Sequence, residues 1–241
     1  MKSTITAKTL FATQWTDFYG WKKLEYLWLF SASFAILLIS YVMGSSWIEV
    51  VSALTGVIGA ILVAKAKLSS YVWGVVATGT YAWIAYAYQL FGEAILYTAL
   101  FFPMQFIGYV IWLRASSRDE REEIVDVEKR LLTAHQRVVV TILTVAAISC
   151  YAVLVGLLKG TSPGLDSATA VLSVLATTLM LLRYAEQWMV WILVNSVAIV
   201  MWVIMVIEHQ GQGWAVLAMW VLYLLNAVYG WWKWRKAQFA N

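Results

Sequence analysis

The sequence predicts an all-α integral membrane protein with eight transmembrane helices, an extra N-terminal helix followed by a 3+1+3 core of two parallel three-helix repeats. Three observations predict this class: the composition, the number of long apolar stretches and the distribution of basic residues. Of the 241 residues, 62% are hydrophobic and 12% are charged, whereas globular soluble chains average about 45–50% and about 25%. One Cys and two Pro exclude a disulfide scaffold and a collagen-like chain.

Eight stretches are long enough to cross a bilayer, for which a helix needs about 20 mostly apolar residues. They lie near 24–43, 47–65, 71–90, 93–113, 137–158, 166–182, 187–207 and 213–232. The second and sixth are predicted to be the weakest spans. Residues 1–23 are mixed and polar, so we expect no signal peptide.

The basic residues predict the orientation of these spans. With the N-terminus inside, 16 of the 17 Lys and Arg residues fall on one side, and only Lys159 falls on the other. Cytoplasmic loops of membrane proteins retain Lys and Arg, so we expect both termini in the cytoplasm. The same rule explains the net charge of +4 without a nucleic-acid partner.

Four regions follow from these spans. Residues 1–46 are predicted to be a cytoplasmic N-terminus and the extra helix, and 47–114 the first three-helix bundle. Residues 115–165 are predicted to be a charged cytoplasmic linker and a central connecting helix, and 166–241 the second bundle with a cytoplasmic C-terminus. The segment 114–137 carries 12 of the 30 charged residues, so we expect a solvated linker with some helix.

Sequence motifs recur on the two sides of the central span. The first match has a spacing of 118 residues and pairs positions 54–55, 65 and 73 with positions 172–173, 183 and 191. The second match has a spacing of 122 residues and pairs Gly108 and Trp112 with Gly230 and Trp234. With a single span between them, both units enter the membrane from the same side, as in parallel transporter repeats. In this register Ala77 occupies the position of Asn195, which predicts an asymmetric site.

The predicted spans hold few groups that could carry ionic or catalytic chemistry. Ionisable side chains lie near the span ends, which argues against a proton pump or a voltage sensor. Motifs for a metal centre, a nucleotide loop or a Cys pair are absent, so we expect no enzyme activity, no metal and no cofactor. Pro103 is predicted to kink the fourth span by freeing the carbonyl of Ala99.

Three amides lie deep in the predicted spans: Gln105, Asn195 and Asn226. They either bond between helices or face a ligand in a central cavity. The second use is favoured for Asn195, because Trp188, Trp191 and Asn195 recur at the helical spacing of three and four and share one face. Indoles of this kind can hold a flat aromatic solute and attract a cationic ring.

Three parts of the sequence carry a resemblance to a known family: Ser46–Glu49, the pattern Arg183-x4-Trp188-x2-Trp191-x3-Asn195, and the polar residue three positions before Gly108. Together they resemble the PnuC-type nicotinamide riboside transporters. The resemblance extends over roughly residues 46–236. It implies a 3+1+3 fold related to the SWEET sugar transporters, a homotrimer, and a bacterial inner-membrane location. It also implies uptake of nicotinamide riboside by facilitated diffusion, with alternating access and trapping by phosphorylation.

The resemblance also predicts which residues bind the substrate. Trp188 and Trp191 would stack on the pyridinium ring, and Asn195, Gln105 and Asn226 would bind the carboxamide or ribose hydroxyls. Two further candidates are Trp73, the repeat mate of Trp191, and Tyr223 on the last span.

Three alternatives are open at the level of sequence. Sister carriers for thiamine or riboflavin share the architecture, although an amide at position 195 suits a carboxamide or a sugar. A membrane enzyme that acts on lipid headgroups is the second alternative, and it would need paired acidic residues or His. A structural protein is the third, and it would need neither a polar stripe nor an internal repeat.

Overall fold

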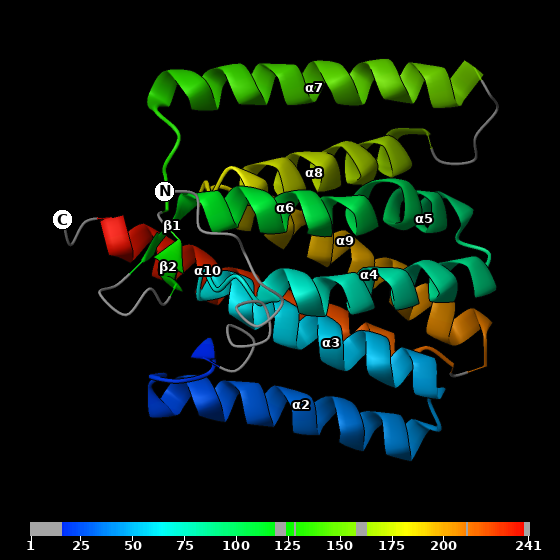
Figure 1. The fold of residues 1–241 in the computed structure, drawn as a ribbon. Coiled ribbons are helices and arrows are strands. Elements are labelled where there is room, and N and C mark those ends of the chain that lie inside the picture. Colours follow the sequence, from blue (N-terminus) through cyan, green and yellow to red (C-terminus); the bar gives the residue numbers. More distant parts are fainter. Residues whose placement is uncertain (1–15, 119–123, 128, 158–162, 211, 239–241) are drawn as a thin grey trace.

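The computed structural model describes residues 16–118, 124–127, 129–157, 163–210 and 212–238 (Figure 1). Within these residues the helices are α2 (Lys23–Met43), α3 (Trp47–Ala64), α4 (Ser70–Ala87), α5 (Phe91–Leu96), the π-helix η1 (Tyr97–Phe101), α6 (Phe102–Ala115), α7 (Ala134–Leu157), α8 (Pro163–Leu181), α9 (Gln187–Glu208) and α10 (Trp214–Gln238). The helices α5, η1 and α6 follow one another without a break. Each of the eight predicted stretches therefore coincides with one helical segment.

Six of these segments are long and apolar enough to cross a membrane: Lys23–Met43, Trp47–Ala64, Phe91–Ala115, Ala134–Val153, Gln187–Glu208 and Trp214–Arg235. The chain is therefore an all-helical, multi-pass membrane protein. The prediction that 47–65 is one of the two weakest spans is wrong, because α3 is more apolar than every other member of this set except α9. Of the eight segments, α4 and α8 are the two outside the set, and α4 owes its lower hydropathy to the polar side chains that it carries inward.

The six helical segments of the two predicted units form a closed ring. In this ring α3 packs against α4 and α10, α9 packs against α8 and α10, and α6 packs against both α4 and α8. The remaining two helices lie outside the ring on opposite sides, α2 against α3 and α10, and α7 against α8 (Figure 1). Over the described stretch Ala134–Val153 of α7 no residue is buried, so this apolar helix is suited to lipid or to another protein chain.

One end of the bundle, which we call the basic end, is where α2 begins and α3 and α10 end. There the Glu25 carboxylate accepts hydrogen bonds from Lys65 Nζ at 2.5 Å and from Lys233 Nζ at 2.7 Å. Burial lowers the pKa of the Lys65 ammonium group to about 8, and the hydrogen bond to Glu25 acts in the opposite direction. The cluster joins the extra helix α2 to both units of the ring.

A carboxylate also holds the turn between the first two helices of each unit. In the first unit, Asp17 Oδ2 accepts a hydrogen bond from the Ser69 amide at 2.9 Å. In the second, the Glu186 carboxylate accepts from the Leu132 amide at 3.1 Å and from Arg137 at 3.0 Å. The segment before each unit is therefore bonded to the equivalent turn through a carboxylate, which the preceding segment supplies in the first unit and the turn supplies in the second.

The structure fixes the register between the two units. The second residue after each first helix is left-handed, Ala66 with φ 58° and Arg183 with φ 68°, and these residues lie 117 positions apart. In this register Thr78 corresponds to Asn195. The expectation that Ala77 takes this position is therefore wrong by one residue, because the turn and not the Trp spacing sets the alignment.

Tryptophans tie the two units to each other reciprocally. Trp112 Nε1 of the first unit donates to the Met180 carbonyl of the second at 3.0 Å, and Trp234 Nε1 of the second donates to the Ala64 carbonyl of the first at 3.0 Å. Both accepting carbonyls lie in the last turn of a helix, where the regular i→i+4 donors run out, and the Met180 carbonyl also accepts from the Arg183 amide at 3.0 Å.

The region before Pro103, where the sequence predicts a kink, is a π-helix. The Phe102 amide donates to the Tyr97 carbonyl, five residues back. Proline has no N–H to offer the carbonyl four residues back, and a π-turn is one way to accommodate this loss. The extra residue per turn directs Tyr97 and Phe101 toward the interior of the ring.

The charged linker contains strands where we expected some helix. In its described part, β1 (Ser116–Arg118) pairs antiparallel with β2 (Ile124–Val127). Backbone hydrogen bonds of 2.8 Å then join Arg130 to Arg183 and Ala185. This part of the linker is therefore bonded to the turn between α8 and α9 at the basic end.

Candidate functional site

A cavity of about 160 Å³ lies inside the ring of six helical segments. Its lining consists of Ser52, Gly56, Gly59, Ala60, Val63, Ser70, Gly74, Ala77, Thr78, Tyr81, Tyr97, Phe101, Gln105, Thr177, Met180, Trp188, Trp191, Asn195, Met219, Trp220, Tyr223, Asn226 and Ala227. All six segments contribute, whereas none of the described residues of α2 or α7 belongs to this lining. Both units are therefore needed to form the cavity.

An aromatic cluster closes the cavity toward the end opposite the basic end. The rings of Tyr81 and Tyr97 lie 4.2 Å apart between their centroids, and Trp220 lies 5.8 Å from Tyr81. The buried Trp202 donates from Nε1 to the Tyr81 hydroxyl at 2.9 Å. We call Tyr81, Tyr97, Trp202 and Trp220 the outer cluster.

A second aromatic cluster closes the cavity toward the basic end. Trp188 packs edge-on against Trp234 with 5.9 Å between ring centroids, and Tyr71 packs edge-on against Trp112 at 5.1 Å. We call these four residues the inner cluster. The cavity thus lies in the middle of the bundle between two aromatic layers, each built from helices of both units.

The cavity is polar but uncharged. Among the described residues that line it, none is Asp, Glu, Lys, Arg or His. Its polar groups are the hydroxyls of Ser52, Ser70, Thr78 and Thr177, the tyrosine hydroxyls, and three amides. An anionic group such as a phosphate would leave water here without gaining a partner of opposite charge, which is costly.

Two of the three amides are oriented by backbone carbonyls. Gln105 Nε2 donates to the Phe101 carbonyl at 3.1 Å, and Asn226 Nδ2 donates to the Ala60 carbonyl at 2.8 Å. Because a carbonyl oxygen only accepts, these bonds determine which amide atom is nitrogen. The amide oxygens therefore remain for a ligand, and Asn226 Oδ1 is buried without a hydrogen-bond partner among the described residues.

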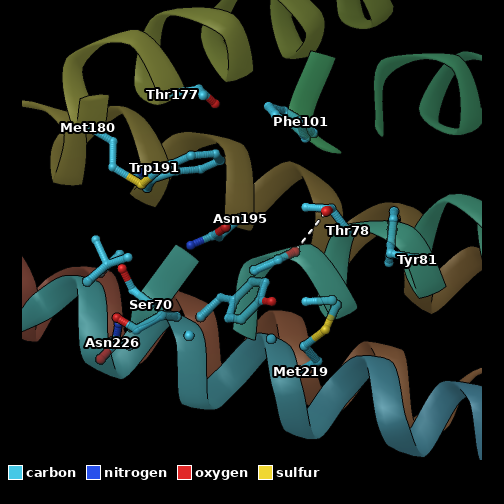
Figure 2. A pocket seen from close by; sticks show the side chains of 18 of the residues that line it. Ser70, Thr78, Tyr81, Phe101, Thr177, Met180, Trp191, Asn195, Met219 and Asn226 are labelled. Carbon is cyan, nitrogen blue, oxygen red and sulfur yellow. Dashed lines mark hydrogen bonds between the residues drawn. The ribbon is translucent and has the colours of Figure 1, made fainter. Parts of the chain in front are cut away.

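The indole and amide stripe of α9 faces this space. Figure 2 shows Trp191 and Asn195 extending from α9 toward the cavity, with Phe101 and Met180 beside Trp191. The ring centroids of Trp191 and Phe101 lie 6.5 Å apart. Asn195 is 3% exposed, so a molecule in the cavity would meet its amide in a water-poor environment, where hydrogen bonds are electrostatically stronger.

The structure brings six of the seven candidate residues to one place. Lining residues include Trp188, Trp191, Asn195, Gln105, Asn226 and Tyr223. Trp73 does not line the cavity; its ring packs against Phe18, with 6.4 Å between centroids, and its Cβ faces Gly59 of α3. In the corrected register it is Gly74 that corresponds to Trp191, which explains why the predicted pairing of Trp73 with Trp191 fails.

Sequence reasoning did not identify the wall formed by α3. This wall consists of Ser52, Gly56, Gly59, Ala60 and Val63. These small residues recur at helical spacing, which is the signal that could have found them. Tyr81 and Tyr97 gave no such signal, because tyrosines are common in membrane helices near the interface.

A ring of helices that is apolar outside and encloses a small, uncharged polar cavity defines a class of protein: a membrane transporter that holds one small organic solute at a time within its helix bundle. The chain belongs to the nicotinamide mononucleotide transporter family, whose model matches residues 46–236. The prediction of a transporter, and not an enzyme, is confirmed by this membership and by the relatives described next.

Two relatives have the name nicotinamide riboside transporter PnuC. The protein from Neisseria mucosa is 33% identical over 219 residues, covering 91% of this chain and 83% of that protein. The protein from Haemophilus influenzae is 33% identical over 220 residues, covering 90% and 92%. A crystal structure of the vitamin B3 transporter PnuC superposes with a TM-score of 0.84 at 32% identity, covering 94% of this chain and 95% of the other. The predicted resemblance to PnuC-type transporters is therefore confirmed.

Proposed function

We propose that this chain carries nicotinamide riboside across the membrane. The observation that supports the proposal most directly is the uncharged cavity, in which three indoles and three amides line a space of about 160 Å³. The names of the relatives from Neisseria mucosa and Haemophilus influenzae point to the same solute.

The chemistry of the riboside matches the cavity group by group. Its cationic pyridinium ring suits the indole faces of Trp188 and Trp191, since a cation over an indole is attracted by the negative face of the ring. Its ribose hydroxyls and carboxamide N–H groups are donors, and they suit the amide oxygens of Gln105 and Asn226 that the backbone leaves available. In this proposal Asn195 and Tyr223 complete the polar contacts.

The riboside fits this cavity better than the mononucleotide that gives the family its name. The mononucleotide carries an additional phosphate, and proteins recognise phosphate with Arg, Lys or several converging N–H groups. The described residues that line the cavity include no cationic side chain. A phosphorylated product in the cytoplasm would therefore have no partner in the cavity, which is the basis for trapping by phosphorylation.

Transport proceeds, in this proposal, by alternating access and facilitated diffusion. The outer and inner clusters open in turn, and each contains aromatic residues of both units, so a small rotation of one unit against the other separates either cluster. The described lining residues offer no ionisable group that could couple the movement to an ion gradient.

The proposed membrane arrangement has eight spans, with α4 and α8 crossing as well. The helix α2 precedes a core of three, one and three spans, which divides the chain into regions 1–46, 47–114, 115–165 and 166–241. The basic end faces the cytoplasm of a bacterial cell, with both termini on that side, since Lys and Arg gather there. We further propose a homotrimer, in which the exposed apolar surface of α7 is available for contact with a neighbouring subunit or lipid.

Calorimetric titration of the purified protein in detergent tests the substrate. Nicotinamide riboside should bind, whereas nicotinamide mononucleotide, thiamine and riboflavin should not bind measurably at the same concentrations. Binding of thiamine or riboflavin in place of the riboside would refute the substrate assignment and leave the transporter class intact. Uptake of the riboside into liposomes without an imposed ion gradient then tests facilitated diffusion.

A further inference from the structure

The side chain of Gln105 reaches from α6 across to α4 and lies directly over Gly74. A Cβ atom added at Gly74 would overlap Gln105 Oε1 and would stand 2.8 Å from Gln105 Cδ. Real Cβ atoms do not come this close to other heavy atoms, so any residue with a side chain at position 74 displaces the Gln105 amide. Both residues belong to the cavity lining.

The amide of Gln105 is held in this place from its other side. Its Nε2 atom donates to the Phe101 carbonyl at 3.1 Å, and the side chain is largely buried. The hydrogen bond fixes the amide plane, and the missing side chain at position 74 makes room for the oxygen. Movement of the amide away from Gly74 therefore also strains or breaks the bond to Phe101.

We propose that Gly74 is a positioning residue for substrate binding, because it allows the Gln105 carbonyl oxygen to occupy the place from which it accepts a hydrogen bond from the substrate. This inference rests on the proposed function, in which Gln105 contacts nicotinamide riboside. Gly74 itself acts only through Gln105. The sequence around Gly74 carries no motif that assigns it this role.

The overlap affects binding more than folding. The atoms that an added Cβ would meet belong to the end of a flexible side chain, which can rotate into the cavity. The helix itself gains from the exchange, since Ala is favoured over Gly in helices by about 1 kcal/mol. A Gly74→Ala protein is therefore expected to fold with a misplaced Gln105 amide.

The chain offers a matched control on the same helix. Gly79 also belongs to α4, and a Cβ atom added there would lie 3.5 Å from the ring of Phe102, which is an ordinary van der Waals contact. Gly79 is not part of the cavity lining. Gly79→Ala therefore reproduces the change in helix propensity without displacing a cavity residue.

The test is calorimetric titration with nicotinamide riboside of five proteins: the parent, G79A, G74A, Q105A and G74A/Q105A. We expect G79A to bind within about twofold of the parent, and G74A and Q105A each to bind roughly tenfold more weakly, the loss typical of one buried hydrogen bond. The double variant should bind as Q105A does, because the two changes remove the same contact.

Four results would decide different points. Equal affinities of G74A and G79A would overturn the inference, and so would a double variant that binds a further tenfold more weakly than Q105A. If G74A fails to fold, the comparison of Q105A with G74A/Q105A still decides, because the overlap is absent from both. If the parent itself does not bind the riboside, the proposed function fails.

Discussion

Replacement of Trp191 by Ala tests the proposed role of the indole stripe. Trp191 is only partly buried, and the nearest aromatic ring that the structure places beside it is Phe101, at 6.5 Å between centroids. Its ring therefore contributes to the cavity wall more than to the packing of the bundle. Removal of the ring should leave the fold intact and take away one face of the binding site.

The size of the effect follows from the interaction that is lost. A cation over an indole contributes about 2 kcal/mol when it is shielded from water, as a pyridinium between the two aromatic clusters would be. A loss of about 2 kcal/mol weakens binding roughly thirtyfold. The assay is calorimetric titration with nicotinamide riboside, combined with a thermal melt of each protein in the same detergent.

Two other tryptophans serve as references for this experiment. Trp232 lies at the basic end and is 58% exposed, so Trp232→Ala should change neither affinity nor stability. Trp188 is 3% exposed and packs against Trp234, so Trp188→Ala should lower both. Unchanged affinity of Trp191→Ala, or an equal loss in Trp232→Ala, would refute the assignment of the α9 face to the substrate.

Three further predictions concern other parts of the molecule. Asn195→Ala should weaken riboside binding roughly tenfold, the cost of one buried hydrogen bond. Calorimetric titration measures this loss, and a thermal melt equal to that of the parent shows that the fold is unchanged. Nicotinic acid riboside should bind much more weakly than the amide, since its carboxylate would meet amide oxygens in the cavity; comparable affinities in the same titration would show that these oxygens do not select donors. Glu25→Gln should destabilise the protein by roughly 1–2 kcal/mol, between the usual costs of breaking an exposed and a buried ion pair, because it removes the counter-charge of the partly buried ammonium groups of Lys65 and Lys233. A thermal melt that is unchanged relative to the parent would contradict the last prediction.

Much of the fold could be predicted from the sequence because the relevant forces are local and additive. The apolar content of a stretch of about 20 residues determines whether it enters a bilayer as a helix, and all eight predicted stretches coincide with helical segments. The spacing of Trp188, Trp191 and Asn195 likewise determines that they share a face, since α-helix geometry is fixed. The segment Arg183–Asn195 indicated the family together with Ser46–Glu49 and the polar residue three positions before Gly108.

Other features depend on contacts between distant segments. Whether a side chain reaches the cavity depends on how its helix is rotated, and this rotation depends on packing against neighbours. Trp73 was misassigned for this reason, and Gly74 was overlooked although it lines the cavity. The one-residue error in the repeat has a similar origin, because the left-handed turn at Ala66 and Arg183 is a matter of backbone conformation.

The sequence by itself therefore determined the membrane class, the helical segments, the end at which basic residues gather, and the family. The tertiary structure alone decided which polar atoms remain available in the cavity. The carbonyls of Phe101 and Ala60 bind the amide nitrogens of Gln105 and Asn226, and this leaves the amide oxygens for the proposed substrate. The first of these hydrogen bonds joins α6 to Phe101, the last residue of the π-helix. The second joins α10 to α3 between residues that are 166 positions apart in the chain, and neither bond is visible in the local sequence pattern.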